Sequence, residues 1–327
     1  MLFKVVHNTR ISALAVVSVA LLALWARLFI VNTVHVTTFD NPAMPLWNKM
    51  IIPLFGYSKY MAGLLCIILA FLTAFTLNRI VLRFSLLHQQ SMLPFFVFTL
   101  LSSAFLSAQK LHPAWVFTLF FVLGIDQLFA GVSVRKPQVR CFNAGAAVGI
   151  GSLFYAKGLF LFVIFFLMMC ILRIANHKSI FASLAGLALP FIVSLACFFY
   201  TDGIAQFFED IKECLISNPG QYEHGVFSRI YMSIMILFNT ISIVMSFNYM
   251  SSQKILTRRY FRCFTWMLFF MAAAFLSPFF SIETIPVLAV VSSVIITLWL
   301  EWMRNKRFAE TVILALMALT VMGMAML

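Results

Sequence analysis

This sequence has few charged residues, and carboxylates are the scarcest of them. Only 10% of its 327 residues are charged, and Asp40 is the one acidic residue among the first 125. Ordinary soluble domains are about 25% charged and roughly 45–50% apolar, whereas this chain is 63% hydrophobic. No polar segment as long as a soluble domain interrupts the apolar runs. The composition therefore excludes a soluble enzyme and predicts one integral membrane domain over residues 1–327.

Several sequence motifs that carry chemistry are also absent. The six cysteines form neither a CxxC pair nor a disulfide framework, and His35, His112 and His224 lack the close spacing of a zinc site. No GxSxG, kinase or zinc-protease motif occurs. The sequence therefore predicts no metal site, and it leaves the cofactor unknown.

The apolar runs are long enough to predict an all-α protein, a polytopic transmembrane helical bundle. A membrane-spanning helix needs about 20 apolar residues. Eleven runs of this kind are centred near residues 20, 69, 100, 122, 148, 165, 190, 239, 272, 292 and 317. The run near residue 148 is the shortest, so the segment 141–173 forms either a hairpin of two spans or a re-entrant pair.

The basic residues predict the orientation of this bundle. Lys and Arg concentrate in the cytoplasmic loops of membrane proteins. With a cytoplasmic N-terminus, sixteen of the 23 Lys and Arg residues lie on the cytoplasmic side. The net charge of +13 is explained by this distribution, and nucleic acid is not an expected partner. The N-terminus is therefore predicted inside and the C-terminus outside.

Two outer loops are long enough to carry function, at about 32–59 and 201–227. The first contains TTFDNPAMPLW, in which Asp40 is a good N-cap for a short helix with Pro42 in its first turn. The second contains Ile204, Phe207, Phe208, Ile211 and Leu215 at helical spacing, which predicts an amphipathic helix at the outer surface. Capping and docking are the structural interpretations of these two features.

Two features inside the apolar runs have structural interpretations too. Gly145 and Gly149 form a GxxxG motif, whose small residues let two helices approach closely in lipid. Asp126 lies near the cytoplasmic end of its span, where an ion pair with Arg135 or Lys136 is a stronger expectation than a transport site.

Parts of the sequence resemble a known family. The runs MLFKVVHNTR, QQSMLPFFVFTLLSSAF, FNAGAAVGIGSLFYAKGLF and SLAGLALPFIVSLACFFYTDG are similar to a family of uncharacterised multi-spanning proteins of the bacterial inner membrane. The layout distantly resembles the GT-C glycosyltransferases, which act on polyprenyl-phosphate-linked sugars at the outer face and use an acid in the first outer loop. Asp40 matches that acid, without the paired acid that is common in that superfamily.

Three functions follow from these features. The first is a GT-C-like transferase, or a degenerate relative, in envelope biogenesis. In it Asp40 is the catalytic residue, and Lys110, Lys157 and Arg229 are the cations available for the substrate phosphate. The second is a non-enzymatic subunit or scaffold that contacts other membrane proteins. A transporter ranks third, since only Asp126 approaches mid-membrane. The lipid bilayer is a partner in all three, and enzymatic activity stays undecided.

Overall fold

The computed structural model of the chain is helical throughout its regular structure. It describes residues 11–30, 44, 46–56, 58–87, 89–105, 108–200, 203–216, 226–251, 253–275, 284–303 and 305–326, and no strand occurs within these ranges. The elements are α2 (Ile11–Ile30), η1 (Trp47–Gly56), α3 (Lys59–Arg83), α4 (Leu93–Ser102), α5 (Pro113–Gly131), α6 (Gln138–Ser152), η2 (Ala156–Leu161), α7 (Phe162–Leu172), α8 (His177–Phe199), α9 (Ile204–Ile216), α10 (Val226–Met250), α11 (Ile255–Phe275), α12 (Ile285–Trp302) and α13 (Lys306–Met326). The all-α fold is therefore confirmed.

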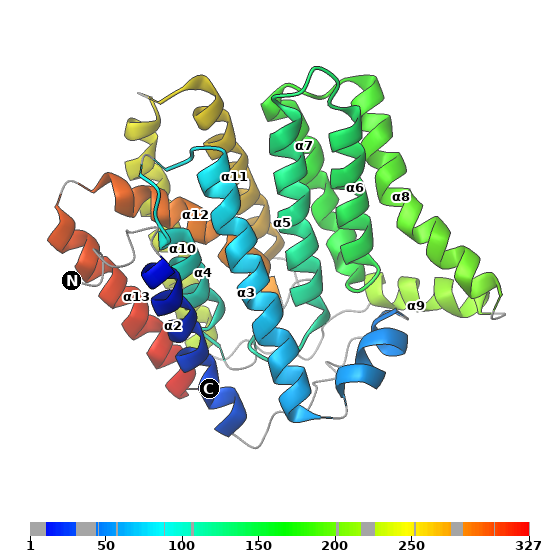
Figure 1. Cartoon of the computed structure of the whole chain (residues 1–327), viewed down its shortest axis with the longest axis horizontal. Helices are drawn as coiled ribbons and strands as arrows, with labels where there is room; N and C mark the ends of the chain where they lie inside the picture. The colour runs from blue at the N-terminus through cyan, green and yellow to red at the C-terminus, as the bar shows by residue number, and fades with distance from the viewer. Residues whose placement is uncertain are drawn as a thin grey trace.

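Successive helices run in alternating directions, so the bundle has two distinct ends (Figure 1). The turns after α3, α5, α7 and α10 lie at one end, which we call the basic end because Arg83, Arg135, Lys136, Arg173 and Lys254 lie in or beside them. The opposite end, which we call the α9 end, carries η1, the tip of the α6–η2 connection and α9. Helix α9 runs across this end instead of along the bundle (Figure 1).

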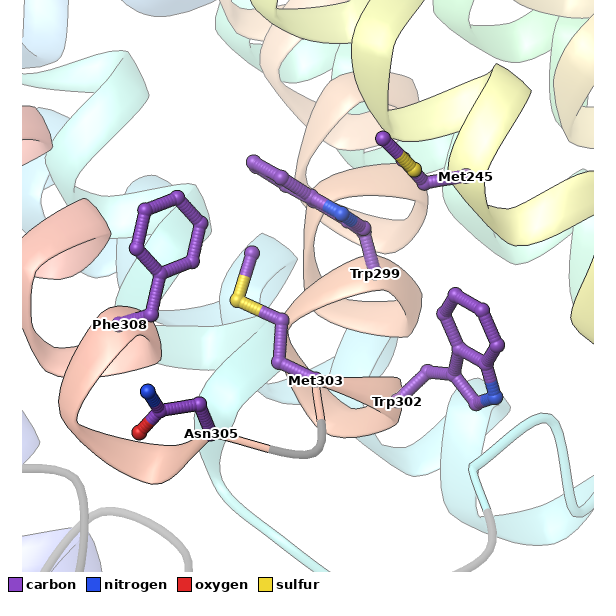
Figure 2. Close-up of a pocket in the computed structure, with 6 residues that line it drawn as sticks. All are labelled: Met245, Trp299, Trp302, Met303, Asn305 and Phe308. Atoms are coloured by element: carbon purple, nitrogen blue, oxygen red, sulfur yellow. The ribbon is translucent and has the colours of Figure 1, made fainter.

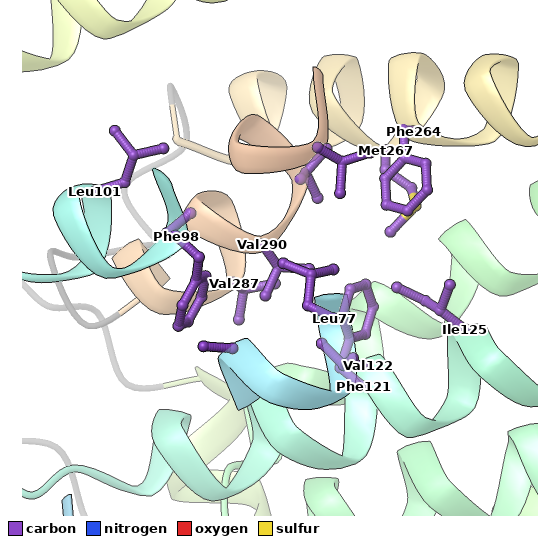
Figure 3. Close-up of a cluster of buried hydrophobic side chains, with 14 of the residues drawn as sticks. Leu77, Phe98, Leu101, Phe121, Val122, Ile125, Phe264, Met267, Val287 and Val290 are labelled. Carbon is purple, nitrogen blue, oxygen red and sulfur yellow. The ribbon is translucent and has the colours of Figure 1, made fainter. Parts of the chain in front are cut away.

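The core lies where five helices meet. Figure 3 shows Leu77 of α3, Phe98 of α4, Phe121 of α5, Phe264 of α11 and Val287 of α12 pointing into one cluster. Helix α4 has only ten residues, all of them buried, and α12 packs against it. At about 1.5 Å per residue, α4 is about 15 Å long, half of a bilayer core of roughly 30 Å. It is thus an interior half-helix.

Glycine lets α6 and α8 pack at very short range. A Cβ atom added to Gly145 would lie 2.0 Å from the carbonyl oxygen of Ser183, and one added to Gly149 would lie 2.6 Å from that of Leu187. From the other helix, a Cβ on Gly186 would lie 2.1 Å from the carbonyl oxygen of Phe142. These backbone contacts confirm the packing role predicted for the GxxxG motif.

The surface of the bundle is that of a membrane protein. Five described helices, α3, α5, α8, α12 and α13, are long and apolar enough to cross a bilayer. Helix α8 has the largest apolar exposure among them: only 22% of its apolar stretch is buried, and Phe181, Ile192 and Val193 face outward. Each of the eleven predicted apolar segments coincides with a described helix, α2 to α8 and α10 to α13.

The segment 141–173 is a hairpin of two short helices. Helix α6 has 15 residues, and η2 continues into the 11 residues of α7 after a turn at Phe154 and Tyr155. At about 1.5 Å per residue α6 is roughly 22 Å long, which is less than the bilayer core. Helix α6 is therefore shorter than α3 and α8.

The predicted partner of Asp126 is wrong. Its carboxylate pairs with Arg83 on α3 instead of Arg135 or Lys136. Helix α5 ends at Gly131, and the turn carries Arg135 and Lys136 outward, where both are exposed. Arg83 lies in the last turn of the neighbouring α3, at the same depth.

Candidate functional site

Helix α9 closes the end of the bundle through one apolar face. Phe207 is 2% exposed and packs on Phe198 of α8, with 4.9 Å between the ring centres. Phe208, the next residue, points away and is 57% exposed. Cys214, two turns further on, is buried against Met44 and Ala156. The predicted amphipathic helix is confirmed, but its apolar face is centred on Phe207 and Cys214, and the prediction that Phe208 belongs to this face is wrong.

Lys157 lies beneath this helix. It follows Ala156 on η2, and it is 4% exposed. Its positive charge acts on the Cys214 thiol, as do the charges of Asp210 and Glu213. Burial, followed by these two carboxylates, raises the pKa of Cys214 to about 12, and Lys157 opposes the rise. One lysine and two carboxylates thus surround the same buried thiol.

A second lysine approaches α9 from η1. The Nζ atom of Lys49 lies 4.1 Å from the centre of the Phe198 ring, within the range of a cation–π interaction. Burial and the charges of Glu213 and Glu209 raise the pKa of Asp210, whereas Lys49 lowers it. Lys49 therefore belongs to the same electrostatic cluster as Lys157. We define the α9 site by Lys49, Lys157, Asp210, Glu213 and Cys214.

The turn between α4 and α5 borders this site. His112 accepts a hydrogen bond at Nδ1 from the backbone N–H of Ala114 (3.0 Å), which caps α5. The other side of its ring meets Tyr155 of the hairpin tip edge-on, with 5.9 Å between the ring centres. Lys110, two residues earlier, is half-buried, and its carbonyl oxygen accepts a hydrogen bond from the Cys66 thiol (3.6 Å).

The structure describes the four residues that were predicted for the site to different extents. Asp40 lies outside the described residues. Arg229 lies in the first turn of α10, and the structure describes its backbone only. Two residues later, Tyr231 meets Phe105 edge-on at 4.6 Å, so this end of α10 adjoins the segment that leads to Lys110. The elements that carry Lys110, Lys157 and Arg229 therefore gather at one end of the bundle.

Sequence reasoning missed Lys49, Asp210, Glu213 and Cys214 as members of this site. Cys214 reads as a lone cysteine in a polar loop, and only its helical offset from Phe207 could have indicated burial. Lys49 gives no such indication, because its position depends on how η1 packs. Among the described residues, no group of three His, Cys, Asp or Glu side chains could hold a metal ion.

Comparison with known proteins assigns neither a family nor a function to this chain. No protein-family model, curated protein or solved structure matches this chain.

Proposed function

We propose that the chain crosses a bacterial inner membrane eleven times, with the basic end in the cytoplasm and the α9 site at the outer face. The distribution of Lys and Arg supports this orientation. The alternating helices support the number of passes, with α4 and the α6–α7 hairpin as the short members. Both termini are then placed as the sequence predicts, the N-terminus inside and the C-terminus outside.

We further propose that the α9 site binds the phosphate of a lipid-linked substrate, and that the protein is a GT-C-like transferase of envelope biogenesis. The observation that carries this proposal is the burial of Lys157 at the hairpin tip, beneath an amphipathic helix. A phosphate is a strong partner for an ammonium in a site of low dielectric constant. Lys110 and Arg229 would contribute from the bordering segments.

The surroundings of the site suit a polyprenyl phosphate. The apolar face of α8 continues through Ile192 to Phe199 and Tyr200, all exposed, directly before α9. A polyprenyl chain in the outer leaflet could therefore lie along α8 with its phosphate near Lys157. Asp40 would act as the general base that activates the acceptor of the sugar.

Complementation of a deletion strain with a measurable phenotype tests this function. Asp40→Asn keeps capping capacity and removes the base, while Asp40→Ala removes both. The proposal expects loss of function in both, and loss in Lys157→Gln, at normal protein abundance. Lys212→Gln is the matched control, since Lys212 is exposed on α9. Full complementation by Asp40→Asn and Lys157→Gln would rule out the transferase.

The alternative is a non-enzymatic subunit or scaffold of an envelope complex. The outer face of α8 favours it, because α8 packs closely on α6 through one side only and leaves most of its apolar stretch exposed, as a long surface for another membrane protein. Phe181→Ala together with Leu184→Ala, both exposed near the start of α8, would then abolish co-purification of a stoichiometric partner. Under the transferase proposal these two substitutions leave complementation unchanged, because the polyprenyl chain is placed further along α8, from Ile192 to Tyr200.

A further inference from the structure

A second site lies toward the basic end, far along the chain from Lys157. A cavity of about 690 Å³ is lined by Met245 of α10, Trp299, Trp302 and Met303 at the end of α12, and Asn305 and Phe308 at the start of α13. We call this the tryptophan groove. Figure 2 shows the side chains of Trp299, Met303 and Phe308 bordering one space between the helices. Its volume is within the roughly 300–1,000 Å³ of ordinary ligand sites.

The groove is formed by a sharp reversal of the chain. Helix α12 ends at Trp302, and α13 begins at Lys306 with Asn305 as its cap, the Asn305 side chain accepting from the Arg307 backbone N–H at 3.2 Å. Trp299 is held in place by an edge-on contact with Phe238 of α10, at 5.5 Å. The two helices diverge from this turn, so their side chains cannot fill the space between them.

The lining is apolar, yet it is open to the surroundings. Met245, Trp302 and Phe308 are all more than one-third exposed. Large apolar side chains exposed together mark a binding surface when polar residues border them. Within a bilayer, the molecule that reaches such a groove at highest concentration is a lipid, and an acyl chain matches the shape and chemistry of the lining.

The border of the groove is positively charged. Lys306 and Arg307 follow Asn305 directly, and both are exposed. Two carboxylates lie nearby: Glu301 accepts a hydrogen bond from the Gln89 backbone N–H (2.6 Å), and Glu310 is half-buried. The exposed charges next to the groove are therefore the two cations, whereas both carboxylates are partly buried, and this favours an anionic headgroup.

We propose that the tryptophan groove binds one anionic phospholipid. Its acyl chain lies between Trp299, Met303 and Phe308, and its phosphate contacts Arg307 and Lys306. Basic pockets between transmembrane helices on the cytoplasmic side are suited to anionic headgroups. This site is independent of Lys157 and of the proposed transferase.

Native mass spectrometry of the purified full chain, titrated with phosphatidylglycerol or phosphatidylcholine, tests the proposal. We expect one phosphatidylglycerol to bind about tenfold or more tightly than phosphatidylcholine, because each basic residue adds to the attraction of an anionic lipid. Lys306→Gln with Arg307→Gln should remove this preference. Arg135→Gln with Lys136→Gln, a pair of exposed cations at another turn of the basic end, should not.

A second pair of variants tests the acyl-chain part. Met245→Trp fills the groove from α10 and should abolish the bound lipid, whereas Met322→Trp, on the exposed side of α13, should leave it in place. Equal binding of the two lipids, or retention of phosphatidylglycerol by Met245→Trp, would overturn the proposal. A dimer that Met245→Trp dissociates would also overturn it, because a second copy would then occupy the groove.

Discussion

The ammonium of Lys49 lies over the ring of Phe198, 4.1 Å from its centre. Phe198 also packs against Phe207, so one aromatic ring contacts residues of both η1 and α9. The charge of Lys49 is thereby held beside Asp210, whose pKa it lowers against the effects of burial and of Glu213 and Glu209. The α9 site thus depends on how α9 docks on α8 beside η1. The burial of this site can be measured through the reactivity of Cys214.

Cys214 should resist alkylation in the folded protein. Its pKa of about 12, against an ordinary value of 9.0, leaves on the order of a thousandfold less thiolate at pH 8. Because folding raises the pKa of Cys214, its protonated thiol contributes to the free energy of unfolding. This contribution is fully present below about pH 9 and is lost as the pH rises toward 12. We expect Phe207→Ala to speed labelling by N-ethylmaleimide and Phe208→Ala, next to it but exposed, to leave it slow. Equal rates in the two variants would mean that α9 does not protect the thiol.

The α6–α8 contact should tolerate no methyl group at Gly145. A Cβ atom 2.0 Å from the Ser183 carbonyl oxygen forces the two backbones apart, which costs about 1–3 kcal/mol or more in a well-packed interior. Gly145→Ala should therefore lower the thermal stability of the detergent-solubilised protein clearly. Gly131→Ala is the control, since its Cβ would have its nearest neighbour at 3.4 Å. Similar melting temperatures for both variants would contradict the close approach.

The ion pair between α3 and α5 should be specific to Arg83. Arg83 Nη1 donates to both carboxylate oxygens of Asp126, at 3.1 and 3.0 Å. Because the arginine is partly exposed, we expect Arg83→Gln and Asp126→Asn each to cost only about 1 kcal/mol or less, and the double variant to cost less than their sum. Arg135→Gln should show no coupling to Asp126. Additive effects of Arg83 and Asp126 would argue against the pair.

The proposed topology makes a prediction at five positions. Reporter fusions after Arg83, Arg140 and Arg262 should report the cytoplasm, because these residues lie toward the basic end, and fusions after Asn48 and at Asn218 should report the outer side. A single reversed result among the five would break the alternation on which the outer position of the α9 site depends.

The sequence predicts more of this fold than of its site, for a physical reason. The length of an apolar run and the helical spacing of its residues are local properties of the sequence. The eleven apolar segments, the amphipathic α9 and the Gly145–Gly149 contact surface can therefore all be predicted from it. The partner of Asp126 cannot be predicted in this way, because the packing of α3 on α5 brings Arg83 beside it. Arg135 is nearer to Asp126 only along the chain. The same applies to Lys49, which reaches Phe198 and Asp210 through tertiary packing alone.

The central claim is that the α9 site holds the phosphate of a lipid-linked substrate, and direct binding tests it most closely. The purified protein in lipid nanodiscs would be titrated with undecaprenyl phosphate and, as the uncharged comparison, undecaprenol. We predict saturable binding of the phosphate and a loss of affinity of about tenfold or more in Lys157→Gln, since a charge-assisted contact to a buried ammonium is removed. Lys212→Gln, which changes an exposed lysine of α9, should bind like the unmodified chain. Equal affinity of Lys157→Gln and Lys212→Gln for undecaprenyl phosphate, or equal affinity of the unmodified chain for the phosphate and the alcohol, would contradict the claim.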